Sequence, residues 1–128
     1  MPTANPAYDS NNVFAKILRG EIPAERVCDS KHSFAFYDIS PATPIHVLVV
    51  PRGAYTDLHD FTSRASDEEI LDFWKLVDKI TAEQSLIPSG FRLISNSGPD
   101  SGQEVPHFHV HLLGGQKLGP ILCPPKKG

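Results

Sequence analysis

The chain has 128 residues, 40% of them hydrophobic, and a formal net charge of −3 at pH 7. A chain of this size can remove about two-thirds of its unfolded surface from water, which predicts one domain with a sizeable core. No cluster of Lys and Arg extends beyond Lys126 and Lys127, which argues against a surface that binds duplex nucleic acid.

The sequence also indicates the cellular compartment of the protein. The N-terminus lacks the basic start and apolar run of a secretory signal, and no stretch reaches the ~18 apolar residues of a membrane span. We therefore expect a cytoplasmic protein with no membrane partner. Cys28 and Cys123 lie far apart and outside any Cys-x-x-Cys pattern, which predicts reduced thiols.

The first expected element is a short N-terminal helix. Residues 1–10 carry little hydrophobic signal and predict a flexible arm, so the single domain is expected to span residues 11–128. In the stretch NNVFAKILRG, Phe14 and Ile17 share one helical face behind an Asn that can cap the helix. Gly20 supplies the C-terminal stop.

A β-hairpin and a third strand are expected next. The segments RVCDS and SFAFYDI flank a polar turn at residues 29–32, which is typical of a hairpin. After Pro41 and Pro44, the β-branched run IHVLVVP predicts a strand with His46 and Leu48 on one face. No helix separates these segments, so the sheet is expected to be antiparallel.

A capping box marks the main helix. Ser66 is followed by Glu69, and apolar residues then recur at spacings of three and four up to about Leu86. Trp74 falls on this apolar stripe, so we expect it in the core. The strand FRLIS, the polar loop NSGPDSGQEV and a final strand complete the chain. This order predicts an α+β fold, with helices on one face of an antiparallel sheet of about five strands.

The final strand carries three histidines at alternate positions, in HFHVH. Side chains two residues apart face the same side of a strand, so His107, His109 and His111 are expected to form one row of imidazoles. A solvated strand face would more naturally use Thr, Lys or Glu, and the row therefore indicates a functional site. Expected to pack inward on the opposite face are Phe108, Val110 and Leu112.

Three kinds of chemistry fit such a row. Neutral imidazole is a common metal ligand, although residues of one strand need a further ligand, which His46 could supply. Imidazoles can also act as general acids and bases. A neutral imidazole can attack phosphorus when an acceptor holds its second nitrogen. The preceding loop favours an anion, because Gly98 and Gly102 let backbone N–H groups approach closely.

The stretch HFHVHLL resembles the motif of the histidine triad family, His-x-His-x-His followed by two apolar residues. The resemblance extends over NVFAKILRGEIPAE, FYDISPATPIHVLVVPR and NSGPDSGQEVPHFHVHLLGGQKLGP, and it is closest to the histidine triad nucleotide-binding branch. It implies the HIT-like fold, a homodimer, and a hydrolase of purine nucleoside phosphoramidates that binds AMP or GMP. It implies neither a cofactor nor a catalytic metal.

The resemblance assigns catalytic roles to four histidines. His109 matches the nucleophile that attacks the α-phosphorus and forms a nucleotidyl-histidine intermediate. The backbone carbonyl of His107 would accept from the other ring nitrogen of that nucleophile. His111 matches the residue beside the phosphate oxygens and the leaving group, and His46 joins the cluster from the neighbouring strand.

The resemblance also implies a nucleotide pocket. Asp38 in FYDIS matches the acid that holds the ribose hydroxyls, although it could instead be a turn acid. Phe36 and Ile39 would line the base pocket. Asn96 and Gln103 would contact the sugar and phosphate, or could simply satisfy loop backbone groups. The complete set around the sugar and phosphate is Asn96, Gly102, Gln103, Glu104 and Val105.

Some positions depart from the family pattern. Asn12 and Ala15 stand where some relatives carry zinc-binding cysteines, so that structural zinc site is expected to be absent. Glu104 replaces a Ser near the leaving group, and Pro106 replaces a common aromatic residue, which leaves the preferred leaving group open.

Two other functions stay open at this level. A dinucleoside polyphosphate hydrolase would use the same histidine on a larger leaving group. A non-catalytic zinc-binding or nucleotide-binding module would keep the pocket without turnover.

Overall fold

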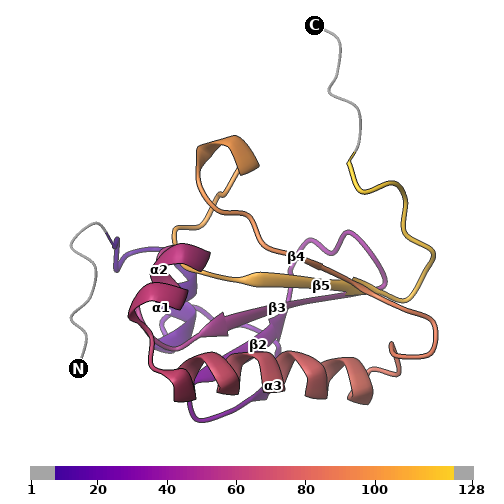
Figure 1. Ribbon diagram of the computed structural model, residues 1–128, viewed down its shortest axis with the longest axis horizontal. Coiled ribbons are helices and arrows are strands. Elements are labelled where there is room, and N and C mark those ends of the chain that lie inside the picture. The colour runs from indigo at the N-terminus through magenta and orange to yellow at the C-terminus, as the bar shows by residue number, and fades with distance from the viewer. Residues whose placement is uncertain (1–7, 123–128) are drawn as a thin grey trace, which may run out of the picture.

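The β-branched run of the sequence forms the central strand of a five-stranded antiparallel sheet, in the order β1-β2-β3-β5-β4 (Figure 1). The structure is a computed structural model and describes residues 8–122. The strands are β1 Arg26–Asp29, β2 Ser33–Tyr37, β3 Ile45–Pro51, β4 Arg92–Ile94 and β5 Val110–Gly114. The predicted α+β class and antiparallel sheet are confirmed.

The register of β3 against β5 brings two histidines together. Leu48 pairs with His111, and His46 pairs with Leu113. His46 and His111 are therefore diagonal neighbours on the same face, at a separation that aromatic side chains can bridge. On the other side of β3, Phe36 lies opposite Leu48, so the same face continues across β2.

The main helix is α3 (Asp67–Glu83), and Figure 1 shows it lying along one side of the sheet. The predicted capping box is present, because Ser66 accepts from the N–H of Glu69 and the Glu69 side chain accepts from the N–H of Ser66. The helix stops earlier than expected because Ser85 adopts a left-handed backbone with a φ of 59°.

The face of the sheet under α3 is a closed hydrophobic core. Phe73, Val77 and Ile80 of the helix pack in one cluster with Val47 and Val49 of β3. The predicted inward residues of the final strand belong to the same cluster: Phe108, Val110 and Leu112. The alternation read from the sequence is therefore confirmed on this face. The expected strand is shorter than predicted, because β5 begins at Val110 and only His111 of the three histidines lies within it.

Trp74 lies at the edge of this core and not inside it. Its side chain is 42% exposed, whereas that of Phe73 is fully buried. Successive helical residues point about 100° apart, so Trp74 turns to the rim once Phe73 faces the sheet. The two rings then meet edge to face, with their centroids 5.1 Å apart. The prediction that Trp74 is a core residue is wrong.

The opposite face carries a smaller helix, α1 (Val13–Leu18), which Asn12 caps with its side chain. Phe14 of this helix packs with Phe36 and Leu48 in a second, smaller hydrophobic cluster. Because α1 has only six residues, it covers part of this face and leaves the rest open.

A further helix, α2 (Leu58–Arg64), has no counterpart among the expected elements. Asp57 caps it by accepting from the N–H of Asp60, and Phe61 is its buried apolar residue. Asp60 in turn accepts from the N–H of Thr56 at 2.8 Å, which fixes the segment that leads into the helix.

Among residues 8–122, no helix has both the length and the hydrophobicity that a membrane span requires. Cys28 is buried and its thiol is free. Residues 1–7 and 123–128, including Cys123, lie outside the described residues. Most of the predicted N-terminal arm therefore lies outside them too.

Candidate active site

The part of the sheet that α1 leaves open forms a cavity of about 550 Å³. Phe14, Ile17 and Phe36 give it apolar walls, and His109 and His111 give it imidazole rings. A cavity with mostly apolar walls and a few convergent polar groups is the usual form of a small-molecule site. All the predicted nucleotide contacts except Gln103 line it: Phe36, Asp38, Ile39, Asn96, Gly102, Glu104 and Val105.

His109 is held in a defined orientation at the wall of this cavity. Its Nδ1 lies 2.7 Å from the backbone carbonyl oxygen of His107. Since a carbonyl only accepts, Nδ1 carries the proton and the lone pair sits on Nε2. The edge-to-face contact with Phe14, at 4.9 Å between centroids, fixes the ring from the side of α1. Within residues 8–122, no group hydrogen-bonds to Nε2 of His109.

His107 has a different environment from the rest of the row. Its side chain is fully buried and lies outside the cavity lining. Its Nε2 is 2.9 Å from the carbonyl oxygen of Pro51, and its Nδ1 is 2.6 Å from the hydroxyl of Tyr8. Only the backbone of His107 thus reaches the site, through the carbonyl that holds His109.

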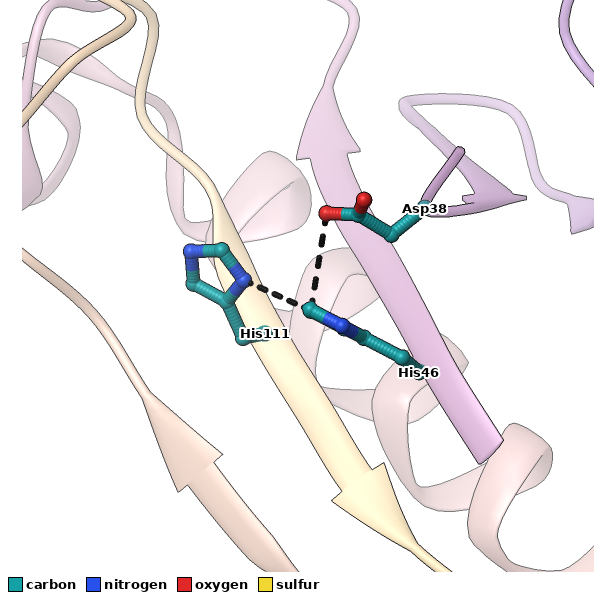
Figure 2. A group of neighbouring side chains, drawn as sticks. All are labelled: Asp38, His46 and His111. Carbon is teal, nitrogen blue, oxygen red and sulfur yellow. Dashed lines mark hydrogen bonds and ion pairs between the residues drawn. The ribbon is translucent and has the colours of Figure 1, made fainter. Parts of the chain in front are cut away.

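His46 and His111 form a hydrogen-bonded pair beside Asp38. Figure 2 shows the side chains of His46 on β3 and His111 on β5 converging with that of Asp38, which directly follows β2. Nε2 of His46 lies 2.9 Å from Nδ1 of His111 and 3.6 Å from a carboxylate oxygen of Asp38. The N–H of Ala42 donates to Nδ1 of His46 at 3.1 Å, so the proton of that ring is on Nε2. His46 therefore donates to His111, whose own Nε2 lies on the far side of the ring (Figure 2).

The same three side chains have the spacing of a metal site, because their ligand atoms lie within 4.8 Å of one another. A cation on Nε2 of His46 would drive the ring proton to Nδ1, where it would face the N–H of Ala42. Two donors would then oppose each other, which favours the hydrogen-bonded pair over metal ligation at this position.

All four imidazoles of the cluster favour the neutral form. Burial lowers the pKa of His107 to about 4. Burial, with the charges of the neighbouring histidines, also lowers the pKa of His111 to about 4. Desolvation lowers the pKa values of His109 and His46 from the ordinary value, and Asp38 only partly opposes this effect. At neutral pH the cluster therefore presents lone pairs and N–H donors rather than positive charge.

The glycine-rich loop approaches the cavity through a short 3₁₀ helix, η1 (Pro99–Ser101). Gly98 and Gly102 flank it with φ values of 80° and 77°, a backbone region that favours glycine. Gln103 ties the loop together: its side chain accepts from the N–H of Gly98 at 2.9 Å and donates to the carbonyl of Thr56 at 2.8 Å. Its amide is thus engaged with backbone rather than with the cavity.

Two contacts of this site were not expected from the sequence. Tyr8, which lies in the predicted arm, bonds to His107, and the N–H of Ala42 sets the tautomer of His46. Neither residue belongs to a periodic pattern, and no local signal points to it.

The sequence model of the HIT domain matches residues 19–118. The chain is 47% identical to an uncharacterised HIT-like protein of Azospirillum brasilense, over 90% of this chain and 94% of that protein. It is 38% identical to the purine nucleoside phosphoramidase of Escherichia coli, over 87% of this chain and 92% of that enzyme.

Solved structures show the same similarity. A histidine triad protein from Clostridium difficile superposes with a TM-score of 0.78 at 38% identity, over 89% of this chain and 98% of that one. A histidine triad nucleotide-binding protein from Candida albicans gives a TM-score of 0.72 at 26% identity, over 88% of this chain and 87% of that one. The family model covers more than half of the sequence and the folds agree, so the chain belongs to the HIT domain family.

Proposed function

We propose that the protein hydrolyses purine nucleoside phosphoramidates through a nucleotidyl-His109 intermediate. The observation that carries this proposal is the orientation of His109, whose Nδ1 is held 2.7 Å from the carbonyl oxygen of His107 while the ring lines the cavity. A neutral imidazole with its lone pair on Nε2 is suited to attack phosphorus. The 38% identity to the phosphoramidase of Escherichia coli supports the same chemistry.

The cavity walls suggest how a nucleotide would lie. The apolar side chains of Phe14 and Phe36 suit the flat face of a purine base. Asp38 keeps one carboxylate oxygen engaged with the N–H of Ser40 at 2.7 Å, which fixes the side chain at the cavity wall. An acceptor in this position suits the ribose hydroxyls. With the sugar there, the phosphate would meet the imidazoles of His109 and His111.

The reaction then takes two displacements at phosphorus. In the first, the lone pair on Nε2 of His109 forms a bond to the α-phosphorus, and the P–N bond to the amine breaks. In the second, water attacks the same phosphorus, the bond to His109 breaks, and the nucleoside monophosphate leaves. Dividing one difficult displacement into two easier ones is the advantage of covalent catalysis.

His111 is suited to stabilise both displacements. Because its Nδ1 accepts from His46, its Nε2–H can donate to a phosphate oxygen or to the leaving nitrogen. The amine takes up one proton from solvent as it leaves, and the attacking water gives one proton back to solvent in the second step. The proton count therefore closes over one turnover.

Trapping the intermediate tests this proposal. Adenosine 5′-phosphoramidate labelled at phosphorus would be mixed with the protein and quenched within milliseconds in alkaline denaturant, since a phosphorus–histidine bond is labile to acid. We expect label on the peptide that contains residues 107–111, and no label in a His109→Asn control. Label on another peptide, or turnover that survives in the control, would overturn the proposal.

Comparing substrates separates the alternatives. Adenosine phosphoramidate and a diadenosine polyphosphate would be assayed side by side at equal concentration. Faster turnover of the polyphosphate would replace the proposed substrate with the larger one. Stoichiometric zinc together with no turnover of either would favour the non-catalytic module.

We also propose that the homodimer implied by the family resemblance forms in solution. Within residues 8–122, β4 pairs with β5 alone and so is an edge strand of the sheet. Leu93 on this strand and Phe91 just before it are each about two-fifths exposed. An edge strand with exposed apolar side chains readily pairs with another chain. A molar mass of one chain in light scattering at micromolar concentration would contradict this assembly.

A further inference from the structure

The hydroxyl of Tyr8 reaches the first histidine of the row across 99 residues of sequence, at 2.6 Å from Nδ1 of His107. The acceptor and donor in this contact can be assigned. The carbonyl of Pro51 can only accept, so Nε2 of His107 carries the ring proton. Nδ1 then carries a lone pair, and the Tyr8 hydroxyl donates its hydrogen to this nitrogen.

With this contact in place, every polar group of His107 has one fixed partner. Its backbone N–H donates to the carbonyl of Val105 at 2.9 Å, and its ring bonds at both nitrogens. The remaining group, its carbonyl oxygen, accepts from Nδ1 of His109 at 2.7 Å. Hydrogen bonds at both ring nitrogens thus fix the position of His107, the residue whose carbonyl orients His109.

The peptide that carries this carbonyl is also held from its other end. The N–H of Phe108 belongs to the same planar peptide unit and donates to the carbonyl of Tyr55 at 2.7 Å. The peptide plane is therefore fixed by the hydrogen bond from the N–H of Phe108 and by the two hydrogen bonds of the His107 ring. Of these constraints, only the bond from Tyr8 comes from the N-terminal end of the chain.

The segment around Tyr8 is itself anchored to α1. The side chain of Asn12, which caps α1, donates to the carbonyl of Asp9 at 2.7 Å. A guanidinium nitrogen of Arg19 donates to the carbonyl of Ser10 at 2.8 Å. The hydroxyl of Tyr8 is therefore presented to His107 by a segment tied to both ends of α1, the helix whose Phe14 contacts the ring of His109.

We propose that Tyr8 is a positioning residue for the nucleophile: its hydroxyl locks the tautomer and the position of His107, and thereby the carbonyl that aims His109. This inference rests on the proposed function for its effect on turnover. Removing the hydroxyl leaves a buried lone pair on Nδ1 without a donor, and the ring must shift, admit water or change tautomer to satisfy it. Each of these responses moves or loosens the carbonyl that His109 needs.

The test is Tyr8→Phe, which removes only the hydroxyl, beside the control Thr81→Val. Thr81 is buried on α3, on the closed face of the sheet, and its hydroxyl donates to the carbonyl of Asp78 at 2.6 Å, so it controls for the loss of a buried hydroxyl bond. With adenosine phosphoramidate and at a temperature where all proteins are folded, we expect kcat to fall about three- to tenfold in Tyr8→Phe and KM to stay within about twofold. Thr81→Val should leave both constants near wild type.

A substrate-free measurement accompanies the kinetics. Nitrogen-15 NMR of the histidine rings reports tautomer and titration at each site. The hydroxyl bond favours the neutral ring of His107, so its loss should raise the pKa of that ring from its value of about 4 in the intact protein. The His109 signals should broaden or split in Tyr8→Phe alone.

The outcomes separate the two proposals. If kcat falls but the His107 and His109 signals do not change, the route through His107 is wrong. If the signals change and kcat does not, Tyr8 has no positioning role. If the wild-type protein does not turn over the phosphoramidate, the proposed function is wrong. The NMR comparison still shows in that case whether Tyr8 sets the geometry of His109.

Discussion

The two faces of the sheet are built from alternate residues of the same strands, yet they are covered differently. On β3, Val47 and Val49 face α3, whereas His46 and Leu48 face the other side. The α3 face is closed by a helix of 17 residues. The other face meets a helix of six residues and keeps a cavity of about 550 Å³.

This difference separates stability from chemistry within single strands. The closed face carries the stacked and tilted aromatic rings of Phe61, Phe73 and Phe108, with centroids 4.9 to 5.4 Å apart. The open face carries the imidazoles and Asp38. Because neighbours in sequence point to opposite faces, adjacent substitutions should act on different properties.

The largest effect is expected on the open face, from His109→Asn. Loss of the nucleophile should lower kcat by more than about 10⁴-fold, while affinity for a nucleoside monophosphate changes little, because the pocket walls remain. Steady-state kinetics and calorimetric titration would measure the two quantities. The neighbour Val110→Ala, on the closed face, should instead lower the unfolding free energy and leave kcat near wild type. Equal losses of kcat in both variants would refute the division between faces.

The next effect is on the closed face, from Phe73→Ala. Truncating this buried ring should cost about 3–5 kcal/mol in unfolding free energy. The adjacent Trp74→Ala should cost about 1 kcal/mol, since Trp74 is 42% exposed. Urea denaturation would measure both, and turnover of the folded fraction should be unaffected by either. A larger loss from Trp74 than from Phe73 would restore the core assignment made from the sequence.

Much of this division could be predicted from the sequence because it depends on local periodicity. The alternation of HFHVHLL placed Phe108, Val110 and Leu112 in the core. The capping box at Ser66 and Glu69 fixed the start of α3. Both signals concern residues within one turn of helix or one short extended segment, where backbone geometry dictates direction.

What could not be predicted depends on contacts between distant segments or on single residues. α2 buries only one apolar side chain, Phe61, so it has no amphipathic stripe to detect. Trp74 shares its stripe with Phe73, and only packing decides which ring faces the sheet. The bond from Tyr8 to His107 joins positions 99 residues apart, for which no local pattern exists.

The histidines of the open face make the stability of the fold depend on pH. His107 and His111 have pKa values of about 4 in the folded protein, below the ordinary value for histidine. Between that ordinary value and pH 4 the unfolded chain binds protons that the folded chain does not, so stability should fall as the pH is lowered through this window. We expect a loss of about 2 kcal/mol from each of these two histidines between pH 7 and pH 4.5, measured by urea denaturation.

The variant His111→Gln sharpens this expectation. It removes one of the groups with a depressed pKa, so its stability should depend less steeply on pH than that of the wild type. A wild-type curve that is flat or that rises toward acid would show that these imidazoles are not held neutral.

The smallest effect expected is on affinity, from Asp38→Asn. The amide oxygen can still accept from the N–H of Ser40, so the loop should keep its shape while the charge that faces the ribose is lost. Binding of a nucleoside monophosphate should weaken about tenfold, and binding of its 2′,3′-dideoxy analogue should not change. Asp72→Asn is the matched control, because it removes the same charge from the closed face, where Asp72 accepts from Ser33. If the dideoxy analogue loses as much affinity as the parent nucleotide, Asp38 acts through the general field of the pocket rather than through the ribose hydroxyls.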